Sequence, residues 1–585
     1  MNYSLSSETS KKSLTLWQTI LKIWPLLVDE KKILFLALSF VITTSLLSLT
    51  APRLIAYAID TYILQKDYHG VLVYGAIILA LYLTALVTSY FQTRLMGEVG
   101  QRVLYRLRNQ IFEKLQSLPV AFFNQNKTGD LISRINNDTD KISEFFSRSV
   151  VQFFSSIFLM IGSAIFLLSL NFKLGLATLT PALVLLVITK VLSAWIKQRN
   201  LLSAKALGEL SSEVQENINN FKVIIAFNRR DFFRRRFSEV NAHNYKSAVG
   251  AGIANISLTP VYGLASNFGQ LIVLAYGISL ISSQNFTIGL LISFLAYSNS
   301  FYNPLRQIAA LWTSLQTALA SWDRVSEILL LENDLPIIKD VAKRITDTVL
   351  EFKGVNFRYP DGKEVLHNVN LNLEKGKTYA LVGPTGGGKT TTASLMSRLY
   401  DPTNGEVVLC GKDIKTYSAK ERAEKIGFIL QEPILFSGTV FDNILYANEE
   451  YKKFTVAELE EVIKQSGLQE LINRFDKGLL TEISVGGEDI SLGQKQLIAF
   501  IRAVLRKPEV LILDEATANI DTVTEQLLEN ILAKLPDQTT KIIIAHRLNT
   551  IENADEIFFV NSGNVIKAGS MKRAVEMLLH GNMKS

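Results

Sequence analysis

Residues 378–391 read TYALVGPTGGGKTT, a short apolar run followed by a loop rich in glycine and by the start of a helix that we expect to extend through Leu399. The glycines and the lysine have the spacing of a phosphate-binding P-loop, and the loop stands between a strand and a helix as that motif requires. Glycines let backbone N–H groups curl round phosphate oxygens, and the helix N-terminus adds partial positive charge. We therefore expect an α/β nucleotide-binding domain here.

The whole loop is predicted to bind the nucleotide. Its residues are Gly383, Pro384, Thr385, Gly386, Gly387, Gly388, Lys389, Thr390 and Thr391. The Lys389 ammonium should contact the β- and γ-phosphates, and the Thr390 hydroxyl should coordinate Mg²⁺. The predicted cofactors are therefore ATP and Mg²⁺.

A second motif, Val510-Leu-Ile-Leu-Asp514-Glu515, ends an apolar strand in two carboxylates. An apolar strand of this kind is typical of a parallel sheet that is covered on both faces. We predict that Asp514 holds Mg²⁺ and that Glu515 orients and polarises the water that attacks the γ-phosphate. Together the two motifs predict an ATPase.

The first 310 residues have a different character, because charge-free apolar runs recur along them. A helix needs about 20 apolar residues to cross a bilayer. Four runs are Ile33–Pro52, Val71–Thr93, Val150–Leu170 and Leu174–Trp195, the last interrupted only near its end by Lys190. The uncharged stretch between Lys246 and Arg306 is long enough for two more, separated by a polar turn at 282–285. The sequence thus predicts six membrane spans.

The connections between the spans alternate in length and charge. Segments 61–70, 171–173 and 282–285 are short, whereas 94–148 and 197–246 are long and rich in Arg and Lys. We predict that the protein lies in the inner (plasma) membrane of the cell. The positive-inside rule then places the long connections, both termini and the ATPase domain in the cytoplasm. As helices, about 18 residues beyond the membrane would extend each span by roughly 27 Å. We expect the tips near Pro119–Asp130 and Glu213–Val223 to contact an ATPase domain.

The amino-acid composition narrows the class of protein and its possible partners. The chain is 48% hydrophobic and 20% charged, which suits a membrane half joined to a soluble half. Its net charge of +7 comes from residues that flank the apolar runs, so we predict no nucleic-acid partner. The single cysteine, Cys410, excludes an internal disulfide. Leu14–Trp24 is amphipathic and is predicted to lie along the inner membrane face rather than to act as a signal peptide.

Polar residues within the spans are few. The fifth and sixth spans carry Asn267, Gln270, Asn299 and Asn303, with Tyr262, Tyr297 and Tyr302 nearby. They could line a substrate cavity or form hydrogen bonds between helices, and the sequence leaves both interpretations open.

Further residues give the C-terminal half a family resemblance. Tyr359, Gln431, Ser491-Leu-Gly-Gln-Lys495, Asp521 and His546 follow one another in the order and approximate spacing of the ATP-binding cassette family, and six helices before one cassette resemble the half-transporters among bacterial exporters. The resemblance covers about residues 14–580. It implies a partner chain, a bilayer and a hydrophobic or amphipathic substrate such as a drug, lipid or peptide.

The resemblance also implies roles for these residues. Tyr359 would stack on the adenine, and Gln431 would link the γ-phosphate and the metal to the membrane domain. His546 would contact the γ-phosphate and act in catalysis with Lys389 and Glu515, while Asp521 would lie in a loop that crosses the dimer interface. Three signature residues would bind ATP held by the opposite subunit, namely Ser491, Gly493 and Gln494.

The signature itself departs from the family pattern. Leu492 stands where the family has its first glycine, Val485 replaces an acidic residue, and Ala518 takes a position that is commonly serine. A leucine side chain could obstruct the close backbone approach that a glycine allows. The pattern is similar to the subunit of heterodimeric exporters that keeps its catalytic Glu but offers a degenerate signature. We therefore favour a heterodimer with one degenerate ATP site, and a homodimer that tolerates Leu492 is the alternative.

The predicted organisation has four parts. Residues 1–32 form a cytoplasmic segment with an interfacial helix, 33–331 the six-span membrane domain with long cytoplasmic extensions, 332–346 a linker, and 347–585 the α/β P-loop ATPase domain. Besides export, import or channel gating by the same architecture is consistent with the sequence. A soluble ATP-dependent assembly factor is disfavoured by the apolar spans.

Overall fold

The computed structural model describes residues 3–5, 28–332, 335–339, 347–360, 362–446, 448–514, 522–533, 535–544, 554–569 and 571–580. These residues divide into two compact units. One comprises residues 1–5, 116–128 and 331–585, and the other comprises 6–115 and 129–330. The expected interfacial helix at Leu14–Trp24 lies outside the described residues.

The second unit is helical. Its elements, together with the tip helix α4, are η1 (Val28–Glu30), α2 (Lys31–Ala58), η2 (Ile59–Ile63), α3 (Tyr68–Ser117), α4 (Val120–Gln125), α5 (Thr128–Ser133), η3 (Arg134–Asp138), α6 (Thr139–Glu144), η4 (Phe145–Ser149), α7 (Val150–Leu170), α8 (Phe172–Asn219), α9 (Phe221–Ala226), α10 (Arg230–Ser282) and α11 (Ile288–Leu329). The segments η2, η3 and η4 are π-helical.

Five of these helices are long and apolar enough to cross a membrane. They are Val28–Ile63, Tyr68–Ser117, Thr128–Leu170, Phe172–Asn219 and Arg230–Ser282. Each of the last four carries a predicted apolar run together with a long helical extension beyond it. The sixth expected span lies in α11, a helix of 42 residues, and its crossing stays a prediction.

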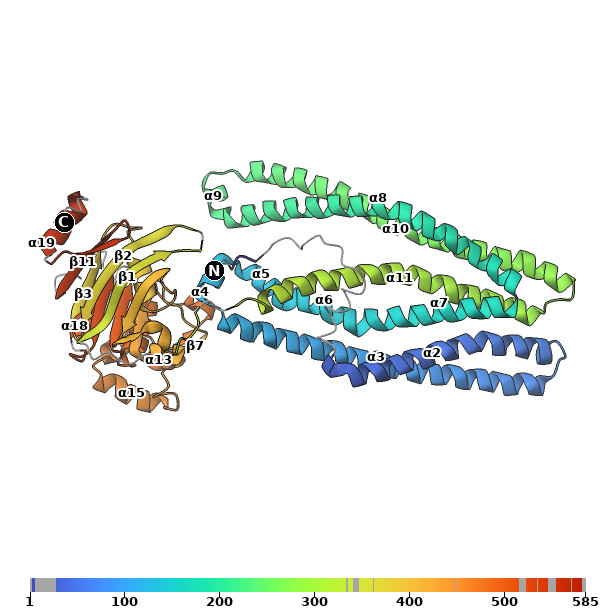
Figure 1. The fold of residues 1–585 in the computed structure, drawn as a ribbon, viewed down its shortest axis with the longest axis horizontal. Helices are drawn as coiled ribbons and strands as arrows, with labels where there is room; N and C mark the ends of the chain where they lie inside the picture. The colour runs from blue at the N-terminus through green and yellow to red at the C-terminus, as the bar shows by residue number, and fades with distance from the viewer. Residues whose placement is uncertain are drawn as a thin grey trace. The chain divides into compact units, whose positions relative to one another are not determined.

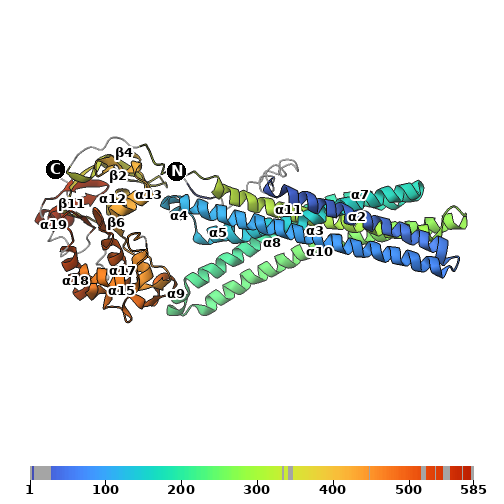
Figure 2. The same cartoon turned by 90° about the horizontal axis from the view of Figure 1, so that it is seen from below.

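Local sequence sets where these helices begin. The Asn171 side chain accepts a hydrogen bond of 3.0 Å from the Leu174 N–H at the start of α8, and Thr287 accepts one of 3.2 Å from the Leu290 N–H at the start of α11. Such caps satisfy backbone donors that the first turn leaves unpaired. Figures 1 and 2 show α8 and α10 side by side, while α11 packs against α7 and α2.

Several polar groups within the spans make contacts between helices. Tyr297 and Tyr302 donate hydroxyl hydrogen bonds of 2.7 and 2.8 Å to the carbonyl oxygens of Leu49 and Thr178, respectively. A hydrogen bond of 2.8 Å also joins Gln270 Nε2 and Asn299 Oδ1. For these four residues the structure supports the helix-to-helix interpretation.

An ion cluster joins η3 to the end of α11. Arg134 is 1% exposed, and its guanidinium donates hydrogen bonds of 2.8 Å to Asp130, 2.7 Å to Glu327 and 2.6 Å to the Arg324 carbonyl oxygen. The Arg324 guanidinium returns to Asp130 at 2.6 Å. A buried charge is tolerated when it is paired and hydrogen-bonded, and Arg134 has two carboxylate partners and a carbonyl acceptor.

The other unit contains the α/β domain. Its strands are β1 (Thr348–Arg358), β2 (Glu364–Glu374), β3 (Thr378–Val382), β4 (Asn404–Leu409), β5 (Lys412–Asp413), β6 (Ile426–Ile429), β7 (Gly438–Thr439), β8 (Glu482–Ile483), β9 (Val510–Asp514), β10 (Thr540–Ile544), β11 (Glu556–Asn561) and β12 (Asn564–Lys567). Its α-helices after α4 are α12 (Lys389–Met396), α13 (Ala419–Lys425), α14 (Val440–Leu445), α15 (Val456–Gln465), α16 (Gln469–Ile472), α17 (Leu492–Val504), α18 (Thr522–Ala533) and α19 (Met571–His580), with single turns η5 (Ile414–Thr416), η6 (Gly478–Leu480) and η7 (Val485–Gly487).

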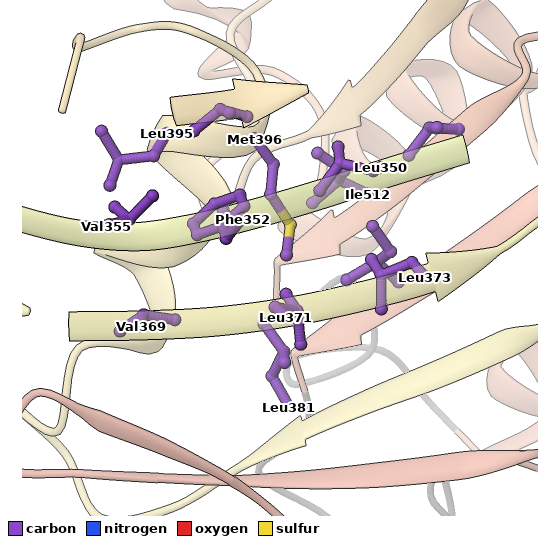
Figure 3. Packing of buried hydrophobic residues seen from close by; sticks show 14 of the residues in the cluster. Leu350, Phe352, Val355, Val369, Leu371, Leu373, Leu381, Leu395, Met396 and Ile512 are labelled. Atoms are coloured by element: carbon purple, nitrogen blue, oxygen red, sulfur yellow. The ribbon is translucent and has the colours of Figure 1, made fainter. Parts of the chain in front are cut away.

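The largest sheet has the order β12-β11-β3-β10-β9-β6, and a smaller antiparallel sheet has the order β2-β1-β4-β5. Alternate residues of β9 enter two different cores, because side chains alternate between the faces of a strand. Val510 and Ile512 join the core shared with β1, β2 and α12, whereas Leu511 and Leu513 join the core formed with α14–α17. Figure 3 shows Phe352, Leu371 and Met396 packed together within the first core. Burial on both faces explains the apolar run before Asp514.

Replacing Arg134 with Met tests the buried cluster. We expect Arg134→Met to destabilise the chain by about 1–3 kcal/mol, because it removes the hydrogen bonds that the guanidinium donates to Asp130, Glu327 and the Arg324 carbonyl oxygen. The measurement is the midpoint of thermal unfolding of the detergent-purified chain. Arg108→Met is the control, since Arg108 pairs with Asp140 at the surface, where ion pairs contribute little. An unchanged midpoint for Arg134→Met would contradict a stabilising role for the cluster.

Candidate nucleotide site

Parallel strands bring the two sequence motifs to one edge of the large sheet. Strands β11, β3, β10, β9 and β6 are parallel neighbours, so their carboxyl ends share one edge. The P-loop follows β3, Asp514 ends β9, and Gln431 comes two residues after β6. Ligands bind at this edge in open α/β sheets. The structure therefore brings these three predicted site elements to the same side of the domain.

The P-loop backbone packs closely on β11. A Cβ atom at Gly383 would lie 1.9 Å from the Val560 carbonyl oxygen, and one at Gly387 would lie 2.5 Å from the same atom. The Gly387 carbonyl oxygen also accepts a hydrogen bond of 3.1 Å from the Gly563 N–H. These two glycines are therefore required for the loop to fit against β11. Gly386 and Gly388 have φ values of +80° and +114°, which side chains rarely adopt.

Polar side chains complete the loop. Lys389 is 5% exposed, and its ammonium lies 2.8 and 3.0 Å from the carbonyl oxygens of Gly383 and Pro384. Thr390, in the first turn of α12, is exposed together with Pro384 and Thr385. A curled glycine loop with an ammonium inside it and an exposed hydroxyl at the helix N-terminus fits a nucleotide triphosphate and a metal ion.

The predicted adenine-stacking residue Tyr359 lies beside the P-loop helix. Its hydroxyl and the Thr391 hydroxyl are 3.0 Å apart, and its ring packs edge-on against Phe357 and Tyr400, with centroid separations of 4.8 and 5.4 Å. Tyr359 is half-buried. Its place near the loop agrees with a role in nucleotide binding, and stacking on adenine stays a prediction.

The short helix α4, which belongs to the same compact unit as the α/β domain, contacts this aromatic group. The Asn124 amide of α4 donates a hydrogen bond of 2.8 Å to the Tyr400 hydroxyl. Burial raises the pKa of Tyr400, and the Asn124 hydrogen bond opposes that rise. Residues Asn124, Tyr400, Tyr359 and Thr391 thus form a continuous path from α4 to the P-loop helix. The sequence predicted contact at this tip but did not identify Asn124 or Tyr400, since a lone Asn and a lone Tyr carry no motif.

The predicted metal-site and catalytic residues are described in part. Asp514 is 3% exposed and is aligned with Ile544 of β10 at the end of its strand. Gln431 is exposed after β6. The predictions for Glu515, Ala518, Asp521 and His546 fall outside the described residues. The roles proposed for all six stay predictions.

The altered signature forms the N-terminus of α17. Ser491 caps the helix in a reciprocal box with Gln494, whose side-chain amide also donates 3.0 Å to the Arg474 carbonyl oxygen. Leu492 occupies the first turn with 37% of its side chain exposed. Gly493 follows it in the same turn. A leucine therefore projects at the surface where the family pattern has a glycine.

The loop before the signature is similarly altered. Hydrogen bonds from the Ser484 hydroxyl and N–H hold the Asp489 carboxylate and lower its pKa. Between these residues Val485 is 82% exposed. An apolar side chain so exposed replaces the acidic one that the family pattern has at this position, and it lies on the same loop as the signature.

Comparison with known proteins decides the family. Residues 34–305 match the ABC transporter transmembrane region, and residues 366–518 match the ABC transporter family. An ABC transporter ATP-binding protein of Bacillus subtilis, described as uncharacterized, is 34% identical over 557 residues, or 94% of this chain and 91% of that protein. The chain belongs to the ABC transporter family. It joins a helical transmembrane domain to an ABC ATPase domain.

Two other relatives of this ABC transporter carry functional names. A fatty acid ABC transporter ATP-binding/permease protein of Mycobacterium bovis is 33% identical over 495 residues, covering 85% of this chain and 78% of the relative. A multidrug resistance ABC transporter ATP-binding and permease protein of Lactococcus lactis is 30% identical over 538 residues, covering 91% and 89%. The family and these relatives identify the chain as an ATP-binding ATPase coupled to transport, homologous to ABC exporters.

Substitution of the P-loop lysine tests the nucleotide site. We expect Lys389→Ala to weaken ATP binding about 10- to 100-fold, because hydrogen bonds to charged groups contribute about 1.5–3 kcal/mol. Equilibrium binding of a fluorescent ATP analogue to the purified chain measures this. Lys377→Ala is the control, since Lys377 pairs with Glu374 at the far end of β3. Equal affinities for the two variants would contradict the placement of phosphates at this loop.

Proposed function

We propose that this chain is one half of a dimeric exporter, which uses ATP to move a hydrophobic or amphipathic substrate across the inner (plasma) membrane. The observation that carries the proposal is a P-loop shaped for a triphosphate on the same chain as helices long enough to span a bilayer. Both termini and the ATPase domain would lie in the cytoplasm, as the basic extensions suggest. The names of the fatty acid and multidrug relatives support a hydrophobic or amphipathic substrate.

A partner subunit is supported by an exposed tip of the helical unit. The segment around α9 presents apolar side chains that are largely exposed within the chain, and Phe227 is 75% exposed. The others are Ile218, Phe221, Val223 and Ile225. Exposed apolar patches of this kind mark interaction sites. We assign this tip to the cassette of the second subunit.

The second subunit is proposed to be a different chain. Leu492 would stand against the nucleotide held by the partner, where its side chain prevents the close backbone approach of a glycine. This chain's own P-loop would be covered by the regular signature of the partner. The assembly would then have one active and one degenerate ATP site. A homodimer that tolerates Leu492 is the alternative.

The chemistry follows from the residues at the sheet edge. Mg²⁺, held by Thr390, Asp514 and Gln431, would neutralise charge that develops on the phosphates. Lys389 binds the β- and γ-phosphates, Glu515 orients the attacking water, and His546 contacts the γ-phosphate. Phosphates bound by both cassettes favour a closed dimer, and loss of the γ-phosphate releases it. Switching from 1:99 to 99:1 requires a preference of about 5.5 kcal/mol for the closed state.

The nature of the partner is tested by purification from the native membrane. A tagged copy of this chain is expected to recover a second cassette chain with a glycine at the position of Leu492. Changing Leu492→Gly in that assembly should raise ATP turnover if the partner keeps its own catalytic Glu. Recovery of this chain alone, as an active dimer, would support the homodimer instead.

Loss of the carboxylate that we propose to orient the attacking water gives a separate test. We expect Glu515→Gln to leave ATP binding unchanged and to slow turnover by about 10²-fold or more, because the amide no longer orients and polarises that water. Phosphate release by the purified assembly measures turnover, and binding of labelled ATP measures affinity. Undiminished hydrolysis by the variant would contradict the assignment of Glu515.

A further inference from the structure

A polar cavity of about 440 Å³ lies within the helical unit, between α3, η4, α7 and α11. Most of its lining is amide, hydroxyl or guanidinium, and none of the lining residues is acidic. The polar lining includes Gln92, Thr93, Ser147, Arg148, Gln152 and Gln307. Two apolar residues, Val151 and Leu159, continue the wall along α7. The cavity thus has a polar, positively charged part and an apolar part.

The cavity lies where the spans pass into their extensions. Gln92 is 24 residues from the start of α3 at Tyr68, or about 36 Å along the helix. Gln152 is 18 residues before the end of α7, and Gln307 is 19 residues after the start of α11, or about 27 and 28 Å. A hydrocarbon core is about 30 Å thick. All three amides therefore lie at the membrane boundary on the side of the extensions, where lipid headgroups are found.

Two polar groups of the cavity have no partner among the described residues. Gln92 is 7% exposed, and its side-chain oxygen accepts no hydrogen bond. Arg148 is exposed and forms no ion pair within the described part of the chain, in contrast to Arg102, which pairs with Glu98 one turn of α3 away. Buried polar groups are nearly always hydrogen-bonded. The buried, unpaired acceptor of Gln92 and the guanidinium of Arg148 line the same cavity, an arrangement that suits a ligand with a hydrogen-bond donor and an anionic group.

Local backbone keeps this space open. Ser147 and Arg148 belong to the π-helical segment η4, and π-bulges occur frequently at functional sites. Gly97 also lines the cavity, and a Cβ atom there would meet nothing within 4 Å. A side chain at Gly97 would therefore occupy the cavity without first colliding with the protein.

We propose that this cavity binds the headgroup of an anionic amphiphile that carries a hydroxyl group. The guanidinium of Arg148 pairs with the phosphate or carboxylate, Gln92 accepts a hydrogen bond from the hydroxyl, and the acyl chain lies along Val151 and Leu159. The proposal rests on the proposed export function and narrows its substrate class to anionic, lipid-like molecules that enter from the boundary of one leaflet.

Binding of lysophosphatidylglycerol to the detergent-purified assembly tests this proposal, with native mass spectrometry as the readout. Lysophosphatidylcholine with the same acyl chain is the neutral comparison and is expected to bind at least about 10-fold more weakly. Inorganic phosphate is expected to leave lysophosphatidylglycerol bound. Displacement by phosphate at equal concentration would overturn the proposal, because the site would then serve a free anion.

Variants separate the cavity from general membrane charge. Arg148→Gln is expected to weaken lysophosphatidylglycerol binding about 10-fold, whereas Arg148→Lys should largely retain it. Arg94→Gln is the control, because Arg94 is exposed two residues after Gln92 but does not line the cavity. Equal losses for Arg148→Gln and Arg94→Gln would overturn the proposal.

A steric pair makes the test independent of charge. Gly97→Leu should abolish binding by filling the cavity, and Gly75→Leu should not, although both glycines lie on α3 with open space beside them. The two control variants, Arg94→Gln and Gly75→Leu, are expected to keep basal ATP hydrolysis. If the unaltered protein hydrolyses ATP and Gly97→Leu still binds lysophosphatidylglycerol normally, the cavity proposal fails while the proposed function stands. Binding that depends on Arg148 and Gly97 in a protein without ATPase activity would uphold the cavity and overturn the proposed function.

Discussion

The carbonyl oxygen of Val560 leaves no room for a side chain at Gly383 or Gly387, and the phosphate site depends on this approach. Strand β11 supports the loop from one side, while the helix α12 begins directly after it. Because the loop is held by packing on β11 and by the Lys389 ammonium, its N–H groups are organised before a ligand arrives. Preorganised donors of this kind stabilise phosphate charge without reorganisation when the reaction occurs.

From this loop a chain of contacts leads outward. Thr391 contacts Tyr359, whose ring packs against Tyr400, and the Tyr400 hydroxyl receives a hydrogen bond from Asn124 of α4. These contacts connect the P-loop helix to α4, a segment of chain that lies between two candidate membrane-spanning helices. Contiguous contacts between side chains are one physical route by which two sites can be coupled.

The sequence predicted much of this arrangement because its motifs are local. The P-loop, the apolar strand before Asp514 and the long basic extensions each follow from the spacing of a few residues. The cavity at Arg148, the cluster at Arg134 and the contact of Asn124 with Tyr400 join residues far apart in the chain, and no local pattern identifies them. The sequence alone identified Leu492 as a departure from the family's signature. Its exposed position in the first turn of α17 came from the structure.

The central claim is that ATP hydrolysis requires a second cassette, because each nucleotide site is completed by the signature of another subunit. ATP turnover by nanodiscs that hold one copy of this chain, compared with nanodiscs that hold the complete assembly, measures this most directly. The account predicts turnover at least about 10-fold slower in the single-chain nanodiscs, since contacts to the γ-phosphate are lost. Turnover at the full rate of the assembly by a single chain would contradict it.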